Sequence, residues 1–362
     1  MEYLTIPESG SSQQQIERAA RVVRAGGLVA FPTETVYGLG CNAFDERAVR
    51  RVFAAKGRPL DNPLIVHVTA DWPMLDFTEG TSRQVVDELA RAFWPGPLTI
   101  VVRGGAEFAP SVRGGRTTVA IRCPDHPVAL DLLEAAGVPI AAPSANSFNY
   151  ISPTSARHVA EDLGDLCDVI LDGGRTKHGL ESTVVEVEQG ELTVLRHGAI
   201  PLELLRGSLA GSVSVHDGTL TERGPRRSPG LHRRHYSPRV ESVAVVPDLD
   251  LRPLALEGLP PDVVIRYVGY DSRQSLVPAD WRTLSFGSIL RLDAVAHDLY
   301  ENLRRFDPAD QRGLLILELS DEPGLGRAID DRLTRAASGS ILRSVDEVER
   351  FLAQLKPTLA DS

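Results

Sequence analysis

Short apolar runs alternate with amphipathic segments between Gln13 and Val194. The runs are rich in β-branched residues and predict strands, whereas the segments repeat their apolar residues every three to four positions and predict helices. This alternation is typical of an α/β domain built on a mixed sheet. The expected strands are 28–31, 64–68, 98–102, 118–122, 140–143, 169–172, 182–187 and 193–195, and the expected helices are 13–25, 46–55, 82–93, 127–136 and 155–163.

The pattern changes after Arg196. A basic, proline-bearing stretch over 223–238 has the composition of a segment between domains. A second, shorter α/β cycle follows, and 362 residues suffice for two domains that each bury a core. We therefore predict a first domain over 1–205, a linker over 206–240 and a C-terminal domain over 241–358. The last of these is expected to contain strands at 262–268 and 314–318 and helices at 292–304, 326–337 and 345–355.

Charge and cysteine content narrow the classes of function. The formal net charge of −10 argues against a protein that coats nucleic acid, because that role needs a basic surface. Cys41, Cys123 and Cys167 are too far apart for a short metal-ligand pair, so we expect reduced thiols and no metal site. The N-terminus has no signal-like pattern and no apolar run approaches the roughly 20 residues of a membrane span. We expect a cytoplasmic protein.

Polar residues follow the first predicted strand, in the stretch 31–40 with sequence Phe-Pro-Thr-Glu-Thr-Val-Tyr-Gly-Leu-Gly. Loops that leave strand ends are where ligands bind in α/β folds. The alternative is a plain turn in which Gly38 and Gly40 supply positive φ.

Two cations follow the helix expected at 46–55. Lys56 and Arg58 can complement the dipole at the helix C-terminus, but a lysine point charge and an arginine fork also suit a triphosphate. The chain has no Gly-x-x-x-x-Gly-Lys-Ser/Thr element, so a nucleotide would need a cradle other than a P-loop.

Four other predicted strands carry polar or charged groups at or near one end, and these groups could contact a ligand. Ser144 and Asn146 follow the strand at 140–143 and can donate to phosphate oxygens, and Ser152 or Thr154 is expected to cap the next helix. Arg122 ends another strand, where an arginine either binds a carboxylate or forms a surface ion pair. The stretch 179–185 adds a glutamate and two hydroxyls, and Arg196 ends one more strand.

Together these segments resemble the threonylcarbamoyl-AMP synthase family in its longer form. That resemblance implies a YrdC-like α/β catalytic domain with a twisted mixed sheet, then a linker and a smaller Rossmann-like α/β domain. The motifs that carry it are Pro-Thr-Glu-Thr-Val-Tyr-Gly-Leu (32–39), Lys-Gly-Arg-Pro (56–59), Asn-Pro-Leu (62–64), Trp-Pro-Gly-Pro-Leu-Thr (94–99), Ile-Arg-Cys-Pro (121–124), Pro-Ser-Ala-Asn (143–146), Ser-Pro-Thr (152–154), Glu-Ser-Thr-Val-Val (181–185), the linker element Pro-Gly-Leu-His-Arg-Arg-His-Tyr-Ser-Pro (229–238) and a closing signature at 324–333.

The resemblance implies an enzyme, a nucleotidyltransferase that makes threonylcarbamoyl-AMP and pyrophosphate from L-threonine, bicarbonate and ATP. Mg²⁺ is expected to be carried by the ATP phosphates. A partner, a tRNA threonylcarbamoyl transferase complex, would use the product to modify tRNA, so this chain is not expected to bind tRNA stably itself. Carry-over of the family's residues gives threonine contacts at Thr35, His67, Arg122 and Ser182, ATP contacts at Lys56, Arg58, Thr118, Ser144, Asn146, Arg196 and Tyr236, and catalytic roles for Lys56 and Arg58.

The tertiary structure is needed to test two features of the resemblance, the place of Tyr236 and the loop over 147–151. Tyr236 in the linker is expected to reach over the nucleotide as a lid. Family members usually have a glycine, and often a basic residue, after Ser-Ala-Asn, whereas this chain reads Ser-Phe-Asn-Tyr-Ile over 147–151. Asn149 accepts positive φ more easily than most residues and can preserve the turn, but Tyr150 cannot replace a cation.

Two other functions remain open at this point. The same domain occurs in carbamoyltransferases that use carbamoyl phosphate and ATP on another acceptor, although this chain has no paired-cysteine zinc elements. A non-enzymatic RNA-binding or ribosome-associated module is suggested by the basic stretch from Arg223 to Arg239. A solvated linker explains that stretch better in an acidic chain.

Overall fold

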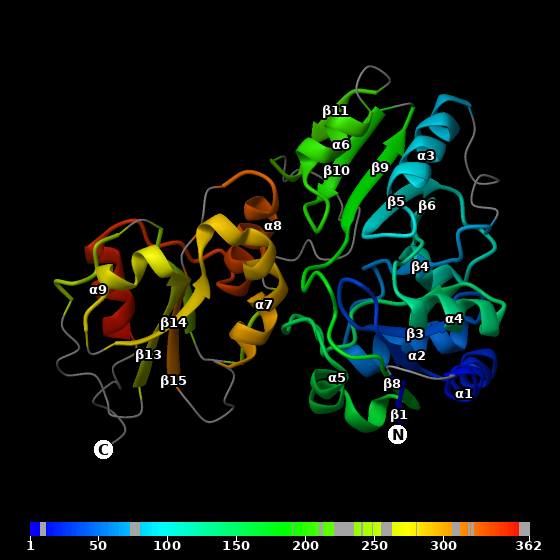
Figure 1. Cartoon of the computed structure of the whole chain (residues 1–362), viewed down its shortest axis with the longest axis horizontal. Coiled ribbons are helices and arrows are strands. Elements are labelled where there is room, and N and C mark those ends of the chain that lie inside the picture. Colours follow the sequence, from blue (N-terminus) through cyan, green and yellow to red (C-terminus); the bar gives the residue numbers. More distant parts are fainter. Residues whose placement is uncertain are drawn as a thin grey trace. The chain divides into compact units, whose positions relative to one another are not determined.

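The structure is a computed structural model that describes residues 1–7, 12–72, 80–189, 191–209, 213–220, 235–239, 242–247, 249–254, 263–279, 281–305, 312–317, 319 and 322–354. The chain divides into two compact units. The first consists of Met1–Phe148 with Ser152–Leu231, and the second of Asn149–Ile151 with His232–Ser362. We describe each unit by itself (Figure 1).

An eleven-stranded mixed sheet forms the first unit, in the order β1-β8-β2-β3-β7-β4-β6-β5-β9-β10-β11. Its central strands, β4 and β6, are parallel to each other, and each also has an antiparallel neighbour. The strands are β1 (Glu2–Thr5), β2 (Val29–Phe31), β3 (Gly38–Asn42), β4 (Ile65–His67), β5 (Leu98–Arg103), β6 (Thr118–Arg122), β7 (Ile140–Ala141), β8 (Val169–Asp172), β9 (Thr183–Glu188), β10 (Glu191–Arg196) and β11 (Val215–Asp217).

Helices cover both faces of this sheet (Figure 1). One face packs against α1 (Gln13–Arg24) and α4 (Pro127–Ala136), whose buried residues form one core cluster with those of β2 and β8. The other face packs against α2 (Glu46–Lys56), α3 (Gly80–Phe93), α5 (Ala156–Asp162) and α6 (Leu202–Ser208). The α/β fold with a mixed sheet that the sequence predicts is confirmed.

Capping fixes α2, which ends at one of the predicted site residues. The carboxylate of Asp45 accepts from the backbone N–H groups of Arg47 and Ala48, and Gly57 ends the helix at φ 65°. The left-handed conformation of Gly57 ends the helix, so Lys56 is its last residue and Arg58 lies in the loop just beyond it.

The loop expected at 31–40 is shorter than predicted. Strand β3 begins at Gly38 and pairs with β2 through Phe31, so only the residues between these strands form a loop. Neither Gly38 nor Gly40 has positive φ, and the turn reading was wrong. A Cβ on Gly40 would lie 2.6 Å from Ile140 Cγ2 and 2.7 Å from Phe31 Cε1, so glycine is needed there for close packing.

The second unit has a four-stranded sheet in the order β12-β15-β13-β14, and all of its strand pairs are parallel. Two of its strands, β12 and β14, escaped the sequence prediction. The elements are β12 (Ser242–Val245), β13 (Val263–Tyr270), β14 (Arg282–Gly287), β15 (Arg312–Leu317), α7 (Leu292–Arg304), α8 (Leu325–Ala336) and α9 (Val345–Gln354). Short 3₁₀ helices in the two units span Pro110–Arg113, Gly164–Leu166, Gly218–Leu220, Asp271–Leu276 and Ile289–Arg291.

Ordered structure of the first unit extends into the range expected to be a linker. Strand β11 pairs with β10 and therefore belongs to the large sheet, although it falls within 206–240. Much of the rest of that range, 221–234, lies outside the described residues. The predicted domain limits themselves stay a prediction.

Candidate functional site

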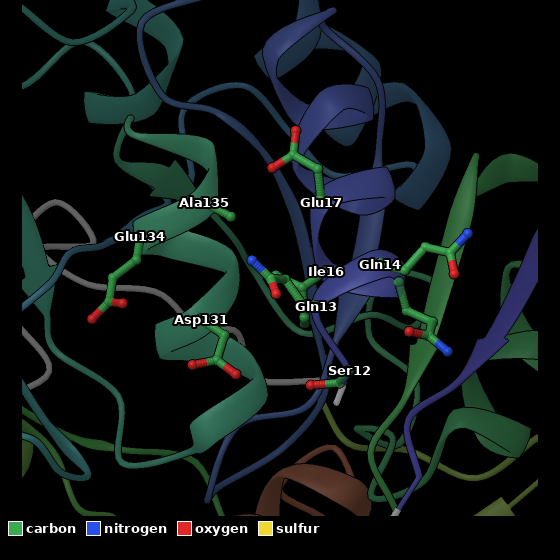
Figure 2. A pocket seen from close by; sticks show the side chains of 9 residues that line it. Ser12, Gln13, Gln14, Ile16, Glu17, Asp131, Glu134 and Ala135 are labelled. Atoms are coloured by element: carbon green, nitrogen blue, oxygen red, sulfur yellow. The ribbon is translucent and has the colours of Figure 1, made fainter. Parts of the chain in front are cut away.

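An open pocket of about 1020 Å³ lies beside the start of α1 and helix α4 (Figure 2). None of the predicted site residues lines it. Its three carboxylates, on Glu17, Asp131 and Glu134, would repel the phosphates of a nucleotide. Residues 8–11, which precede the pocket-lining Ser12, lie outside the described residues, and the pocket carries no argument about function.

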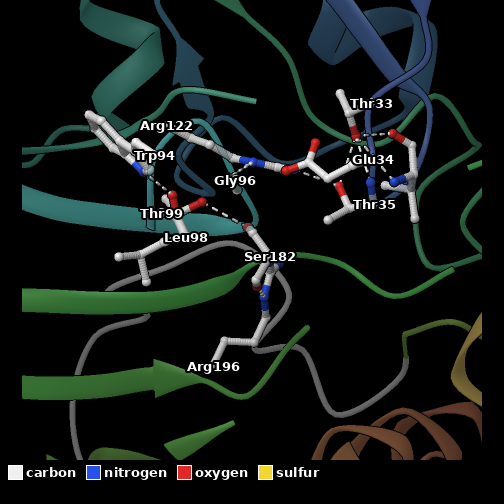
Figure 3. Close-up of polar contacts among 11 residues, drawn as sticks. Thr33, Glu34, Thr35, Trp94, Gly96, Leu98, Thr99, Arg122, Ser182 and Arg196 are labelled. Carbon is white, nitrogen blue, oxygen red and sulfur yellow. Dashed lines mark hydrogen bonds and ion pairs between the residues drawn. The ribbon is translucent and has the colours of Figure 1, made fainter. Parts of the chain in front are cut away.

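Arg122 ends β6 and is the centre of a buried polar network in the first unit (Figure 3). Its Nη2 donates to Thr35 Oγ1 at 2.9 Å and lies 2.7 Å from Glu34 Oε1, while its Nε donates to the carbonyl oxygen of Gly96 at 3.3 Å. Only 3% of Arg122 is exposed, so the alternative of a surface ion pair was wrong. Among the described residues nothing accepts from Nη1, which remains available to a ligand oxygen.

Thr33 fixes the conformation of the loop that presents Thr35. The Thr33 hydroxyl donates to the carbonyl oxygen of Val36 at 2.7 Å and accepts from the backbone N–H of Thr35 at 3.2 Å. The Thr33 and Thr35 hydroxyl oxygens are 2.8 Å apart. This local turn is typical of threonine, and it directs the Thr35 hydroxyl toward Arg122.

His67 lies beside Arg122, because the two residues are partners in the parallel register of β4 and β6. Burial, and then the positive charge of Arg122, lower the pKa of His67 to about 3. Its Nδ1 has no hydrogen-bond partner in the part of the chain that the structure describes. The imidazole is therefore neutral at physiological pH and can take part in a hydrogen bond with a ligand hydroxyl.

Ser182 and Arg196 form a second buried pair. Arg196 Nη2 donates to the carbonyl oxygen of Ser182 at 2.9 Å and to its Oγ at 3.1 Å, and Ser182 Oγ lies 2.7 Å from Thr99 Oγ1. The backbone N–H of Thr183 donates to the carbonyl oxygen of Pro97, one residue after the Gly96 oxygen that Arg122 binds. The segment 96–99 thus connects the Arg122 network with the Ser182 pair (Figure 3).

Lys56 joins α2 to the loop that follows β7. Its Nζ donates to the carbonyl oxygens of Ser144, at 2.5 Å, and of Asn146, and to Asn146 Oδ1 at 3.4 Å. These bonds cross 88 and 90 positions of sequence, so the ammonium does more than complement its own helix. Burial, and then Arg58, lower the pKa of Lys56 well below its ordinary value. The structure thus brings three of the residues expected at ATP together.

Arg58 and Thr118 have other surroundings. Arg58 Nη2 donates to Asn62 Oδ1 at 2.7 Å and to the carbonyl oxygen of Pro63 at 2.8 Å, which closes the loop before β4. Thr118 begins β6 and Arg122 ends it, so four residue steps of about 3.3 Å separate their Cα atoms by roughly 13 Å. A ligand that contacted both would extend along the strand.

Ser152 has a partner other than the one expected of it. Its hydroxyl donates to Glu181 Oε1 at 2.6 Å in a buried pair, and the cap of α5 is Ser155, whose side chain accepts from the backbone N–H of His158. The expectation that Ser152 or Thr154 caps this helix was wrong, because the helix begins at Ala156 and Ser155 takes the cap position.

Tyr236 belongs to the second unit and is fully buried there. Its ring stacks on Tyr300 at a centroid distance of 5.6 Å, and the guanidinium carbon of Arg332 lies 5.2 Å from its centre. The linker element and the closing signature therefore meet in one core. The contacts with Tyr300 and Arg332 hold the Tyr236 ring in the second unit. Contact of its hydroxyl with a nucleotide stays a prediction.

Asn149 has φ 71°, which confirms the expectation that this residue accepts positive φ. With its two successors it is part of the second unit. The Asn149 carbonyl oxygen accepts from the backbone N–H of Ser237 at 3.0 Å, and the Ile151 carbonyl oxygen accepts from Arg304 Nη2 at 2.7 Å. The Tyr150 ring carries no charge and packs under the guanidinium of Arg239, 5.4 Å from its centroid.

Sequence reasoning missed several members of these networks. Glu34, Thr33, Thr99 and Gly96 lie inside the motifs but were given no role. Only the chemistry of the Pro-Thr-Glu-Thr motif, with a carboxylate between two hydroxyls, could have indicated Glu34.

The described residues contain no group of three His, Cys, Asp or Glu side chains that could hold a metal ion. All three cysteines are free and buried, and burial raises the pKa of Cys123 to about 11 and of Cys167 to about 12. They are thiols at neutral pH. No described helix is long and apolar enough to cross a membrane.

Comparison with known proteins assigns the chain to a family. The domain family described as "Telomere recombination" matches residues 21–198, and the one described as "Threonylcarbamoyl-AMP synthase, C-terminal domain" matches residues 200–338. Threonylcarbamoyl-AMP synthase of Pyrococcus abyssi is 38% identical over 338 residues, covering 91% of this chain and 96% of the relative. This chain belongs to the threonylcarbamoyl-AMP synthase family. The Bacillus subtilis member is 39% identical over 350 residues, covering 93% and 96%.

A solved structure extends the likeness to three dimensions. The crystal structure of P. abyssi Sua5 complexed with L-threonine matches this family member with a TM-score of 0.82 and 36% identity, over 95% of this chain and all of the other. The resemblance that the motifs indicated is confirmed, as is the two-domain α/β fold.

Proposed function

We propose that this chain is an L-threonylcarbamoyladenylate synthase, which converts L-threonine, bicarbonate and ATP into threonylcarbamoyl-AMP and pyrophosphate. The observation that carries the proposal is the nearly full-length match to proteins named threonylcarbamoyl-AMP synthase, at 38% and 39% identity. A related crystal structure contains L-threonine, which supports the amino-acid substrate.

Arg122, Thr35, His67 and Ser182 are proposed to bind threonine. Arg122 is buried, keeps Nη1 available and has its orientation fixed by Gly96 and Thr35, so it suits the carboxylate of an amino acid. His67 is neutral and has an unpaired Nδ1 among the described residues, which suits the threonine hydroxyl. Ser182 is proposed to contact threonine through its hydroxyl, which also accepts a hydrogen bond from Arg196.

ATP is proposed to bind along Lys56, Arg58, Thr118, Ser144, Asn146 and Arg196. Lys56 contacts both Ser144 and Asn146, so the ammonium and two polar residues would face the phosphates together. The catalytic part assigned to Lys56 and Arg58 is electrostatic, since cations offset the charge that develops on the phosphates. Mg²⁺ would be carried by the phosphates.

The reaction needs positioning more than acid–base chemistry. The threonine amine and bicarbonate give a carbamate with loss of water, and a carbamate oxygen then attacks the α-phosphorus while pyrophosphate leaves. A carbamate is a weak and short-lived nucleophile, so holding it in line and excluding water would supply most of the acceleration. Tyr236 is proposed to contribute as a lid over the nucleotide.

The product is proposed to pass to a tRNA threonylcarbamoyl transferase complex in the cytoplasm. The chain carries a net charge of −10, which does not favour stable direct binding of tRNA. Supply of an activated intermediate is therefore the proposed part that this chain plays in tRNA modification.

Pyrophosphate release from ATP by the purified full chain tests the proposal. The assay contains Mg²⁺, omits threonine or bicarbonate in turn, and identifies the adenylate by mass. We expect release that requires both substrates. Turnover with carbamoyl phosphate but not with threonine would establish the carbamoyltransferase alternative in its place.

A matched pair of variants ties the activity to the site. Arg122→Lys keeps a charge but loses the fork, and we expect it to lower kcat/KM for threonine about 100-fold, as loss of a charged bidentate contact does. Arg103→Lys is the control, because Arg103 is an exposed arginine of the same sheet that pairs with Glu188. It should leave kcat/KM unchanged.

A further inference from the structure

Glu34 is a buried carboxylate that accepts no hydrogen bond from the residues that the structure describes. It is 0% exposed, and neither of its oxygens has a hydrogen-bond partner among the described residues. Its Oε1 lies 2.7 Å from Arg122 Nη2, so the two form an ion pair, but without the alignment of a hydrogen bond. A buried carboxylate accepts several hydrogen bonds when satisfied, so this one still has acceptor capacity for a ligand.

The charges around Glu34 make Arg122 its counter-ion. His126 and His178 are electrostatic neighbours of Glu34, but burial lowers the pKa of each below its ordinary value. Neither histidine is therefore a cation at neutral pH. Among the described residues the ion pair with Arg122 is the one that Glu34 makes. Arg122 and Glu34 thus form a buried ion pair with one positive and one negative member side by side.

This arrangement matches a zwitterion. An amino acid brings a carboxylate for Arg122 and an ammonium for Glu34, and the sum of the buried charges stays at zero. The corresponding hydroxy acid brings only the carboxylate and leaves an uncompensated negative charge in a site of low dielectric constant, which is costly. From this geometry we propose that Glu34 binds the α-ammonium group of threonine and selects an α-amino acid over a hydroxy acid. The inference rests on the proposed function.

A purely structural part for Glu34 predicts something different. If Glu34 only oriented Arg122 and neutralised it, its loss would weaken every ligand that carries a carboxylate to the same extent. If Glu34 binds the ammonium, its loss weakens only ligands that have one. These two roles are distinguished by measuring how wild type and a Glu34 variant each bind two ligands, one with an ammonium group and one without.

The experiment measures dissociation constants by calorimetry for L-threonine and for (2S,3R)-2,3-dihydroxybutanoate, in which a hydroxyl replaces the ammonium. The wild-type chain is expected to bind threonine about 10- to 100-fold more tightly, the range for a hydrogen bond to a charged group. Glu34→Gln should lose about that factor for threonine and little or nothing for the hydroxy acid. An equal loss for both ligands, or a loss for neither, would overturn the proposal.

Two further variants secure the result. Glu34→Asp retracts the carboxylate by one methylene and should recover part of the preference for threonine, which also serves if Glu34→Gln does not fold. Glu46→Gln is the matched control, since Glu46 is an arginine-paired carboxylate of the same unit whose partners are Arg50 and Ser111. It should leave both constants unchanged. A wild-type chain that binds no threonine would instead refute the proposed function.

Discussion

The guanidinium carbon of Arg332 lies 5.2 Å from the centre of the Tyr236 ring, and both side chains are fully buried in the second unit. Arg332 comes from the closing signature at 324–333 and Tyr236 from the linker element, two segments almost 100 residues apart. Tyr300 of α7 stacks on the same ring. Two motifs that the sequence could only list separately are therefore one aromatic and cationic cluster, defined by Tyr236, Tyr300 and Arg332.

Tyr236→Ala is expected to destabilise the second unit by about 3–5 kcal/mol, because it leaves a cavity and removes the ring that Arg332 faces. Tyr236→Phe keeps the ring and should cost less than half as much. Trp281 is the one tryptophan of the second unit's range, so urea unfolding followed by its fluorescence, with Trp72 and Trp94 changed to Phe, reports on this unit. Equal effects of the two variants would show that the ring is not what stabilises the cluster.

The elements that sequence predicted well are those with a clear local pattern of apolar residues. Strands β6 and β8 and helix α4 have the predicted bounds, because β-branched runs and an apolar helix face determine them locally. Strand β3 was missed since two of its five residues are glycines, and glycine has low strand propensity. At Gly40 the close approach of Phe31 and Ile140 leaves no room for a side chain. Strand β1 pairs only at the sheet edge with β8, over a separation that no local pattern indicates.

For the site residues, too, the sequence indicates the local chemistry but not the distant partners. The residue types at Arg122 and Lys56 predict anion binding, which stays a prediction, but their partners within the fold lie 87 and 90 positions away along the chain. Whether an arginine is a surface ion pair or a buried anchor depends on what covers it, and sequence alone does not give that. The pairing of Arg122 with Glu34 became visible only with the tertiary structure.

Asn149 has positive φ, and the identity of its side chain should matter in a definite order. Asn149→Gly is expected to preserve or slightly raise stability, since glycine adopts φ 71° without strain. Asn149→Val should cost about 1–3 kcal/mol because a β-branched residue is strained there. Thermal unfolding of the three proteins measures the order. A Val variant as stable as the Gly variant would show that the turn is not maintained in solution.

His67 makes the stability of the first unit depend on pH. Its pKa is about 3 in the folded state and about 6.5 when unfolded, so below pH 6.5 the unfolded chain binds the extra proton. Stability should therefore be full above pH 6.5 and fall as pH decreases toward 3, by about 2 kcal/mol at pH 5 from this residue alone.

Urea unfolding between pH 5 and 8 measures this contribution as the difference between wild type and His67→Gln, which has no titrating ring. His216→Gln is the control, because His216 is an exposed histidine of the same unit. Wild type and His67→Gln with parallel pH profiles would mean that His67 is not buried as a neutral ring.

Gly40 should tolerate no side chain. In Gly40→Ala the added Cβ would lie 2.6 Å from Ile140 Cγ2 and 2.7 Å from Phe31 Cε1, so these buried side chains would have to shift, at a cost of about 1–3 kcal/mol. Gly207 in α6 has nothing within 4 Å of an added Cβ, and Gly207→Ala is expected to stabilise the chain by up to about 1 kcal/mol. Opposite signs in chemical unfolding are the expected result. If both variants lower the free energy of unfolding, the backbone conformation of glycine, rather than the short contacts of an added Cβ, would explain the effect at Gly40.

Lys56 is expected to couple nucleotide binding to proton uptake. Burial, and then Arg58, lower its pKa in the free protein, whereas the phosphates of a bound nucleotide would raise the pKa again. In the window above the lowered pKa and below about 10.5, some protein molecules therefore have a neutral Lys56, and ATP binding should take up a proton. Calorimetry at alkaline pH in two buffers with different ionisation enthalpies measures this uptake directly. Lys56→Arg keeps the positive charge but does not titrate, so its binding enthalpy should be the same in both buffers. If the wild-type enthalpy is also independent of the buffer throughout that window, Lys56 does not titrate near the nucleotide, and its place beside the phosphates is refuted.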